Sequence, residues 1–152
     1  MCLPIKPFKI EREWVHAGLS CAVVQAREDQ HRCGYVRVPQ GHPLYGASYE
    51  TPNVEVHGGL TFAELEPCTE HKDGQGWWFG FDCAHFMDAT HDPNFDPSQA
   101  TKPDTVRLMK IHQDIRKKYP LGLGEEPEHY WTQDEAVAET ERLAEQLAVA
   151  SV

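Results

Sequence analysis

Long apolar runs are absent from this sequence, and positive charge is in short supply. No segment of the 152 residues approaches the roughly 20 apolar residues that a membrane-spanning helix needs, which argues against a membrane partner. Lysine and arginine total 14 against 24 aspartate and glutamate residues, so the formal net charge is -10. Because binding to nucleic acid depends on neutralising phosphates with cationic side chains, this balance argues against nucleic acid as a partner.

Cysteine is sparse and shows no pairing pattern. The five residues are Cys2, Cys21, Cys33, Cys68 and Cys83, an odd number without C-x-x-C spacing. A chain of this size needs no disulfide framework, so we expect all five thiols to be reduced, as in a cytoplasmic protein. Residues 1–10 lack an apolar run of signal-peptide length, which also favours a cytoplasmic location.

Strand signals occupy the first half of the chain. Two short apolar segments, 19–25 and 33–38, are separated by a polar stretch, which predicts a hairpin. Residues 54–57 are typical of a short strand that continues towards Phe62, and 77–82 is strongly β-prone. Together these segments predict an antiparallel sheet of about four strands within residues 19–83.

Helical signals follow a linker at 89–102 that is rich in aspartate, asparagine and proline. Apolar spacing predicts a helix near 103–119, and a T-x-x-E capping box opens a second helix near 132–149. The narrow, alanine-rich stripe of the second helix suits packing on the sheet or a contact in a homo-oligomer. The sequence predicts one α+β domain over 1–152, sheet-rich over 14–91, with a helical tail over 103–150 that covers the sheet.

The first candidate for a site is His57, which two glycines follow. On a strand, Glu55 and His57 share one face, so that face is either exposed to solvent or lines a cavity. The amides of Gly58 and Gly59 can form a concave nest for an anion, and Thr61 adds a hydroxyl group. The alternative is a tight turn in which the glycines only bend the chain.

The strand at 77–82 is the second candidate. Trp78, Gly80 and Asp82 share one face, while the aromatic residues of the other face predict core. The missing side chain at Gly80 leaves a gap through which a ligand or another backbone segment can approach. Trp78 is therefore a candidate ligand-binding residue and Asp82 a candidate catalytic residue.

A metal site is possible around the end of this strand. If the chain turns helical after residue 83, His85 and Asp88 lie on one side of it. With His57 and Asp82 they make a mixed nitrogen and oxygen set that zinc, manganese or iron accepts. Such an ion would activate water for hydrolysis, although the spacing matches no specific metal motif.

Two other chemistries need no metal. His57 and His85 can act as general acid and base, with Asp82 beside them, because histidine titrates near neutral pH. Cys83 is a candidate nucleophile two residues before His85. Cysteine is among the most buried residue types, however, so we expect a packed and inert Cys83.

The loop at 41–49 supplies two further ligand-binding candidates, His42 and Tyr45. Loops often carry function, and an aromatic side chain offers a stacking face. We expect the loops at 41–49, 57–61 and 82–91 to form one pocket.

Four ordered motifs carry a resemblance to a known family. They are CGYVRVP at 33–39, GHPLYG at 41–46, VHGGLTF at 56–62 and WWFGFDCAH at 77–85. With them the chain resembles small proteins encoded by bacteriophages and by some bacteria, over roughly residues 14–92 and more loosely the helical tail. The resemblance implies a viral origin, and with it the host cytoplasm, but no particular activity or cofactor.

Three functions fit these residues. The first is a small hydrolase of a phosphorylated or nucleotide-like small molecule, with His57, Asp82 and His85 as catalytic residues. The second is a protein that binds and sequesters such a ligand without turnover, which a phage can use against host signalling. The third is a structural or protein-interaction module in which the histidines and aspartates are structural.

Overall fold

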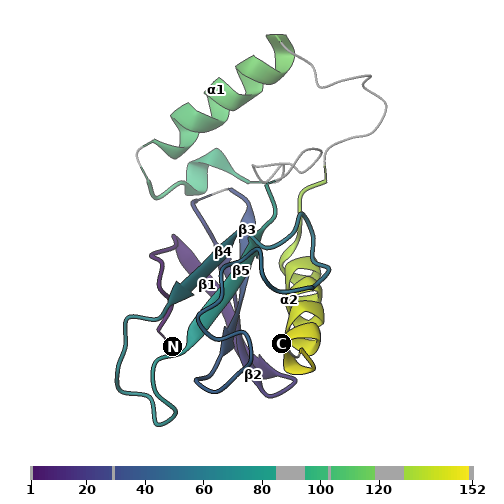
Figure 1. Ribbon diagram of the computed structural model, residues 1–152. Helices are drawn as coiled ribbons and strands as arrows, with labels where there is room; N and C mark the ends of the chain where they lie inside the picture. Colours follow the sequence, from purple (N-terminus) through teal and green to yellow (C-terminus); the bar gives the residue numbers. More distant parts are fainter. Residues whose placement is uncertain (1, 29, 85–94, 103, 119–128, 151–152) are drawn as a thin grey trace.

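A five-stranded antiparallel sheet with one helix laid across it forms the body of the protein (Figure 1). The computed structural model describes residues 2–28, 30–84, 95–102, 104–118 and 129–150. The elements are β1 (Lys9–His16), β2 (Leu19–Gln25), β3 (Arg32–Val38), β4 (Phe62–Leu65), β5 (Trp77–Asp82), a short 3-10 helix (Pro97–Gln99), α1 (Thr105–Lys118) and α2 (Gln133–Ala148). The strand order is β1-β2-β3-β5-β4. The predicted α+β class is confirmed, with five strands in place of about four.

β1 is the strand that the sequence did not predict. Its residues are mostly charged, and only Ile10, Trp14 and Val15 are apolar. β1 lies at an edge of the sheet, where charged side chains are common, and its pairing with β2 shifts register between Ile10 and Arg12. This irregularity breaks the apolar–polar alternation by which a strand is identified in a sequence.

Residues 54–57 do not form the predicted strand, because α2 satisfies their backbone. The N–H of Glu55 donates to Oε1 of Gln146 (2.7 Å), and Nε2 of Gln146 donates to the carbonyl oxygen of Glu55 (2.7 Å). The N–H of His57 donates to Oε1 of Glu139 (3.0 Å). With these groups paired, the segment needs no neighbouring strand, and β4 begins only at Phe62.

Both faces of the sheet are covered. On one face α2 encloses the larger core, whose buried members include Val36, Phe79, Phe81, Leu143, Ala144 and Leu147. On the opposite face Tyr35 and Trp78 pack with Leu3 of the N-terminal segment. The alanine-rich stripe of α2 therefore packs on the sheet, and an oligomeric contact through this helix stays a prediction.

α1 confirms the predicted helix near 103–119 but not the prediction that it covers the sheet. It lies beyond the end of the sheet (Figure 1), since α2 and the N-terminal segment already cover the two faces. Val106 and Ile111 remain about half exposed, at 47% and 46%. The start of α1 is attached to the turn after β2 by the buried carboxylate of Glu28, which accepts hydrogen bonds from Thr105 Oγ1 (2.6 Å), Thr101 N (2.6 Å), Thr101 Oγ1 (2.8 Å) and Lys102 N (2.9 Å).

This carboxylate makes the stability of the protein sensitive to acid. Burial alone would raise the pKa of Glu28, but the hydrogen bonds from Thr105, Thr101 and Lys102 outweigh it and lower the pKa from 4.5 to about 2. A lowered pKa in the folded state means that the stabilising contribution is present above pH 4.5 and is lost as the pH falls towards 2. In urea titrations we expect the free energy of unfolding to fall across this interval, and to fall less in a Glu28→Gln variant. An equal decline in both proteins would contradict the assignment to Glu28.

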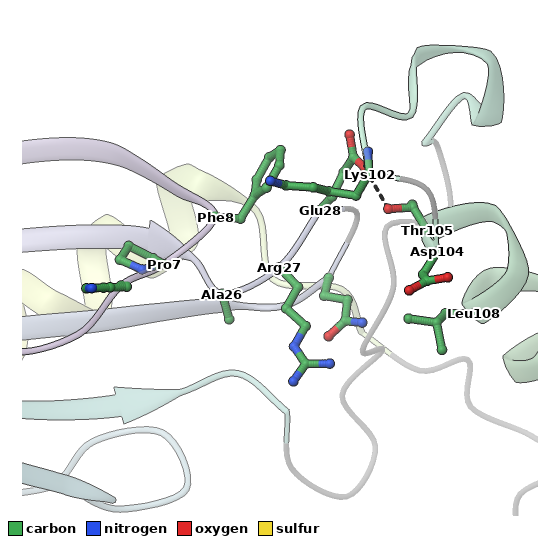
Figure 2. Close-up of a pocket in the computed structure, with 11 residues that line it drawn as sticks. Pro7, Phe8, Ala26, Arg27, Glu28, Lys102, Asp104, Thr105 and Leu108 are labelled. Carbon is green, nitrogen blue, oxygen red and sulfur yellow. Dashed lines mark hydrogen bonds between the residues drawn. The ribbon is translucent and has the colours of Figure 1, made fainter.

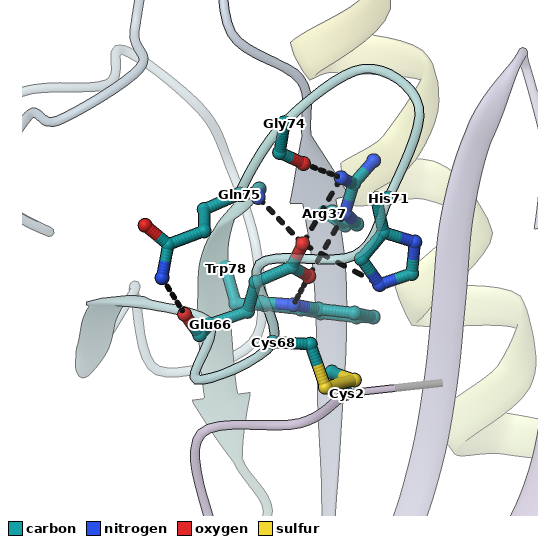
Figure 3. The surroundings of a disulfide bond; sticks show 9 residues. Cys2, Arg37, Glu66, Cys68, His71, Gly74, Gln75 and Trp78 are labelled. Carbon is teal, nitrogen blue, oxygen red and sulfur yellow. Dashed lines mark hydrogen bonds and ion pairs between the residues drawn. A yellow bond between two sulfur atoms is a disulfide. The ribbon is translucent and has the colours of Figure 1, made fainter.

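Cys2 and Cys68 form a disulfide, with their Cα atoms 5.8 Å apart. The expectation of five reduced thiols is therefore wrong for this pair, which lies 66 residues apart in the chain and has no local sequence signal. The bond attaches the N-terminal segment to the loop after β4 (Figure 3). The other three cysteines, Cys21, Cys33 and Cys83, are buried and form no disulfide within the described residues. The cytoplasmic location stays a prediction; within the described ranges, no helix has the length and apolarity to cross a membrane.

Candidate functional site

A groove of about 440 Å³ lies between residues 54–57 and the beginning of α2. We call it the His57 groove. Its lining residues are Val54, Glu55, Val56, His57, Trp131, Glu139 and Arg142. Two aromatic rings, one guanidinium group and two carboxylates thus surround a space within the usual size range of small-molecule sites.

Contacts with each other and with the sheet hold the aromatic rings of the His57 groove in place. The ring of His57 packs against that of Trp131, with centroids 4.3 Å apart and an interplanar angle of 35°. Arg32 at the start of β3 donates from one guanidinium nitrogen to the carbonyl oxygen of Trp131 (2.9 Å). The same guanidinium forms a bidentate pair with Glu11 of β1 (2.6 and 3.1 Å), so the position of Trp131 is fixed from the sheet.

Arg142 is the one lysine or arginine among the described residues that line the His57 groove. Its guanidinium donates to Oε1 of Glu139 (3.0 Å) and to Oε2 of Glu55 (3.3 Å). Glu139 is mostly buried, with 13% of its side chain exposed, whereas the side chain of Glu55 is 89% exposed. A guanidinium has five N–H donors, and these two contacts leave others to face a ligand in the groove.

The predicted catalytic set is only partly brought into this groove. His57, a predicted catalytic residue, lines it together with Glu55, a predicted ligand-binding residue, but Asp82 does not. Asp82 instead accepts hydrogen bonds from the Thr61 hydroxyl (3.4 Å) and from the N–H of Ala84 (3.1 Å). Residues 61 and 82 therefore contact each other, but neither lines the His57 groove.

The predicted metal ligands His85 and Asp88 lie outside the described residues. Within the described part of the chain, no group of three or more histidine, cysteine, aspartate or glutamate side chains is arranged to hold a metal ion. The zinc, manganese or iron site with His57 and Asp82 therefore stays a prediction, and we derive no chemistry from it.

The two glycines after His57 form a turn. Gly58 and Gly59 both have positive φ angles, of 69° and 79°, which favour glycine. The N–H of Gly59 donates to the carbonyl oxygen of Val56 (2.8 Å), so this amide closes the turn and is not part of an anion nest. The turn interpretation of this motif therefore agrees with the geometry.

His42 and Tyr45 belong to structural contacts at a different place. Nε2 of His42 lies 2.7 Å from the carbonyl oxygen of Leu147 near the end of α2, and Nδ1 accepts from the N–H of Leu44 (3.0 Å). The hydroxyl of Tyr45 donates to the carbonyl oxygen of Gln75 (2.8 Å). Neither residue lines the His57 groove, and residues 85–91 of the third predicted loop lie outside the described residues, so the single pocket of three loops stays a prediction.

Trp78 is a core residue, which corrects its assignment as a ligand-binding residue. Its side chain is fully buried, and its Nε1 donates to Oε2 of Glu66 (3.0 Å). The predicted gap at Gly80 is filled by the ring of Tyr35, since a Cβ atom at Gly80 would lie 2.5 Å from two of the ring atoms. Packing of the opposite sheet face, and not a ligand, explains the small residue at this position.

Glu66 is the centre of the buried polar cluster on this face (Figure 3). It accepts two hydrogen bonds from Arg37 (3.0 and 3.1 Å) and one from the N–H of Gly76 (2.6 Å), in addition to that from Trp78. Arg37 also binds both carboxylate oxygens of Asp73 (2.9 and 3.0 Å). Because its charges are paired and its donors bonded, this cluster is a structural unit that holds the loop after β4.

The remaining candidate nucleophile, Cys83, is buried at 1% exposure and packs in the core with Phe81 and Leu143. This agrees with the expectation of an inert thiol. Two other buried thiols have their pKa raised to about 12, chiefly by burial: Cys21 and Cys33. These three buried cysteines therefore give no support to a covalent mechanism.

Trp131, Glu139 and Arg142 are the site residues that the sequence did not reveal. Glu139 and Arg142 are three residues apart on α2, which is an ordinary surface ion pair in a sequence. Trp131 directly precedes the N-cap residue Thr132, where an apolar side chain commonly packs on the helix. Nothing local connects these three to His57, more than 70 residues away. No protein-family model matches the chain, and no curated protein or solved structure shows significant similarity to it.

Proposed function

We propose that the protein binds a nucleotide-like small molecule in the His57 groove and does not convert it. The observation that carries the proposal is the set of groups around one space: aromatic faces from His57 and Trp131, donors from Arg142, and carboxylate acceptors from Glu55 and Glu139. A nucleobase stacks on aromatic rings with a gain of roughly 1–3 kcal/mol per base. Its amino groups suit the carboxylates, and a phosphate suits the guanidinium.

Binding without turnover is favoured over hydrolysis because Asp82, one of the three proposed catalytic residues, does not line the groove, and His85 lies outside the described residues. Among the described residues that line the groove His57 is the only histidine, and Asp82 instead accepts hydrogen bonds from the Thr61 hydroxyl and the N–H of Ala84. The resemblance to bacteriophage proteins extends this proposal: the bound molecule would be a host signalling nucleotide that the protein sequesters. Hydrolysis remains the competing proposal.

Adenosine monophosphate is a suitable probe. We expect it to bind in isothermal titration calorimetry, and an Arg142→Met variant to bind about tenfold more weakly, since one charge-assisted hydrogen bond is lost. Arg142 is about half exposed, so the substitution leaves the core intact. An Arg12→Met variant, which removes an equal charge from the exposed edge strand, should bind like the wild type.

The same samples separate binding from hydrolysis. After incubation we expect chromatography to return the nucleotide intact. Release of adenosine and phosphate by the wild type, abolished by His57→Ala, would instead support the hydrolase and overturn sequestration. Equal affinity of the Arg142→Met and Arg12→Met variants would show that the nucleotide does not occupy the His57 groove.

A further inference from the structure

A second pocket, of about 370 Å³, lies where the N-terminal segment, the turn after β2 and the start of α1 meet (Figure 2). We call it the Lys102 pocket. It shares no residue with the His57 groove. Its lining residues are Lys6, Pro7, Phe8, Ala26, Arg27, Glu28, Gln30, Lys102, Asp104, Thr105 and Leu108. Three segments that are distant in the sequence thus build one enclosure.

Cations gather in the Lys102 pocket although the chain is strongly acidic. Lys6, Arg27 and Lys102 line it, in a sequence with a formal net charge of -10. None of these three forms an ion pair with a described residue. Lys102 and Arg27 extend to opposite sides of Ala26 (Figure 2). Three cations in the lining of one pocket make it a more favourable place for an anion than the rest of this acidic chain.

The two carboxylates in the lining lower its formal charge from +3 to +1 but do not pair with its cations. Both oxygens of Glu28 are occupied by the hydrogen bonds that attach α1. Asp104 lies at the solvent-exposed rim, 3.6 Å from Arg107, with 70% of each side chain exposed. Neither carboxylate therefore forms an ion pair with a lysine or arginine of the lining, and the cations remain available to an outside anion.

Pro7, Phe8, Ala26 and Leu108 give the lining an apolar part, which is held in place from several sides. Phe8 lies with its ring 5.8 Å from Nζ of Lys102, and its N–H donates to the carbonyl oxygen of Ala26 (3.2 Å). The segment before it is anchored by the burial of Leu3 and by the disulfide of Cys2. Because these residues are ordered before a ligand binds, less conformational entropy is lost on binding.

We propose that the Lys102 pocket binds a small organic anion, in which a phosphate or carboxylate contacts the cations and an aromatic or aliphatic group packs on Phe8 and Leu108. Its volume lies within the range of roughly 300–1,000 Å³ that is usual for small-molecule sites. The ligand is a small molecule and not a nucleic acid, because the remainder of the chain is acidic and repels a long polyanion.

Phenyl phosphate tests this proposal, since it joins a phosphate to one aromatic ring. In a titration followed by ¹H–¹⁵N correlation spectra, we expect shifts at the amides of Phe8, Ala26, Arg27 and Lys102, and none at Glu55 or His57. A Lys6→Met/Lys102→Met variant should bind at least about tenfold more weakly. Both lysines are exposed, so the fold should persist, as the unchanged spectrum of the core would verify.

A Lys72→Met/Lys110→Met variant is the matched control, because it removes two exposed lysines that do not line the pocket. We expect it, and Arg142→Met, to bind phenyl phosphate like the wild type. Benzoate shows whether a carboxylate serves as well as a phosphate, and binding of either anion supports the site. Equal binding of uncharged phenol, equal weakening in the control, or no shift at the pocket amides would overturn it, whatever the outcome at the His57 groove.

Discussion

A Glu66→Ala variant is expected to lose about 3–5 kcal/mol of unfolding free energy, the usual cost of breaking a buried ion pair from one side. The side chain of Glu66 is fully buried, and its removal leaves the guanidinium of Arg37 without its buried partner. The indole N–H of Trp78 and the N–H of Gly76 also lose their acceptor. Urea unfolding measures the loss, and the melting temperature should fall by roughly 6–20 °C for a chain of this size.

Asp73→Asn is the control for this variant. Asp73 binds the same guanidinium as Glu66, but half of its side chain is exposed to solvent, so we expect a loss of about 1 kcal/mol or less. A loss for Glu66→Ala as small as that for Asp73→Asn would mean that the cluster does not hold the loop after β4.

A Gly34→Ala variant is expected to be destabilised by about 1–3 kcal/mol, although strand propensity alone predicts the opposite sign. Glycine inside a strand costs roughly 0.5–1 kcal/mol relative to alanine, so a methyl group at an open position would stabilise. At Gly34, however, a Cβ atom would overlap Oγ1 of Thr140 on α2 and the ring of Phe81. The free-energy cost of inserting a methyl group into a packed core exceeds the gain from the higher strand propensity of alanine. Chemical denaturation of the two proteins gives the sign directly.

The Thr140→Ala substitution identifies the source of this effect. It removes one of the two groups that the new methyl would meet, so the double variant should be less destabilised than the sum of the two single variants. Thr140 is fully buried and its hydroxyl donates to the carbonyl oxygen of Ala136 (2.7 Å), so the single substitution has a cost of its own. Strict additivity, or a Gly34→Ala variant more stable than wild type, would mean that α2 does not approach β3 this closely.

Elements with a strong local pattern were predictable from the sequence. β2, β3 and β5 follow runs of apolar and β-branched residues, and α2 begins at the predicted capping box of Thr132 and Glu135. β1 was missed because its charged residues fit an edge position that only the folded sheet defines. The segment 54–57 was assigned wrongly because its hydrogen-bond partners, Glu139 and Gln146, lie on a helix more than 80 residues away.

The candidate site was predictable only as single residues. Glu55 and His57 were identified, but the groove exists because α2 places Glu139 and Arg142 beside them and Arg32 holds Trp131. These contacts join residues separated by 80 to 100 positions, for which local periodicity carries no signal. The Lys102 pocket was not predicted for the same reason. Its cations, Lys6, Arg27 and Lys102, are isolated in the sequence and line one pocket only in the folded protein.

The position of α2 after the whole sheet in the order of the chain has a consequence for protein synthesis. The sheet from β1 to β5 is complete at Asp82, but Leu143 and Leu147, which cover Val36 and Phe79, are translated last among the elements. At roughly 5–20 residues per second, the ribosome needs roughly 3–13 s to proceed from β5 to the end of α2. During that time the growing chain carries an uncovered aromatic and aliphatic sheet face, a surface to which a ribosome-associated chaperone would bind.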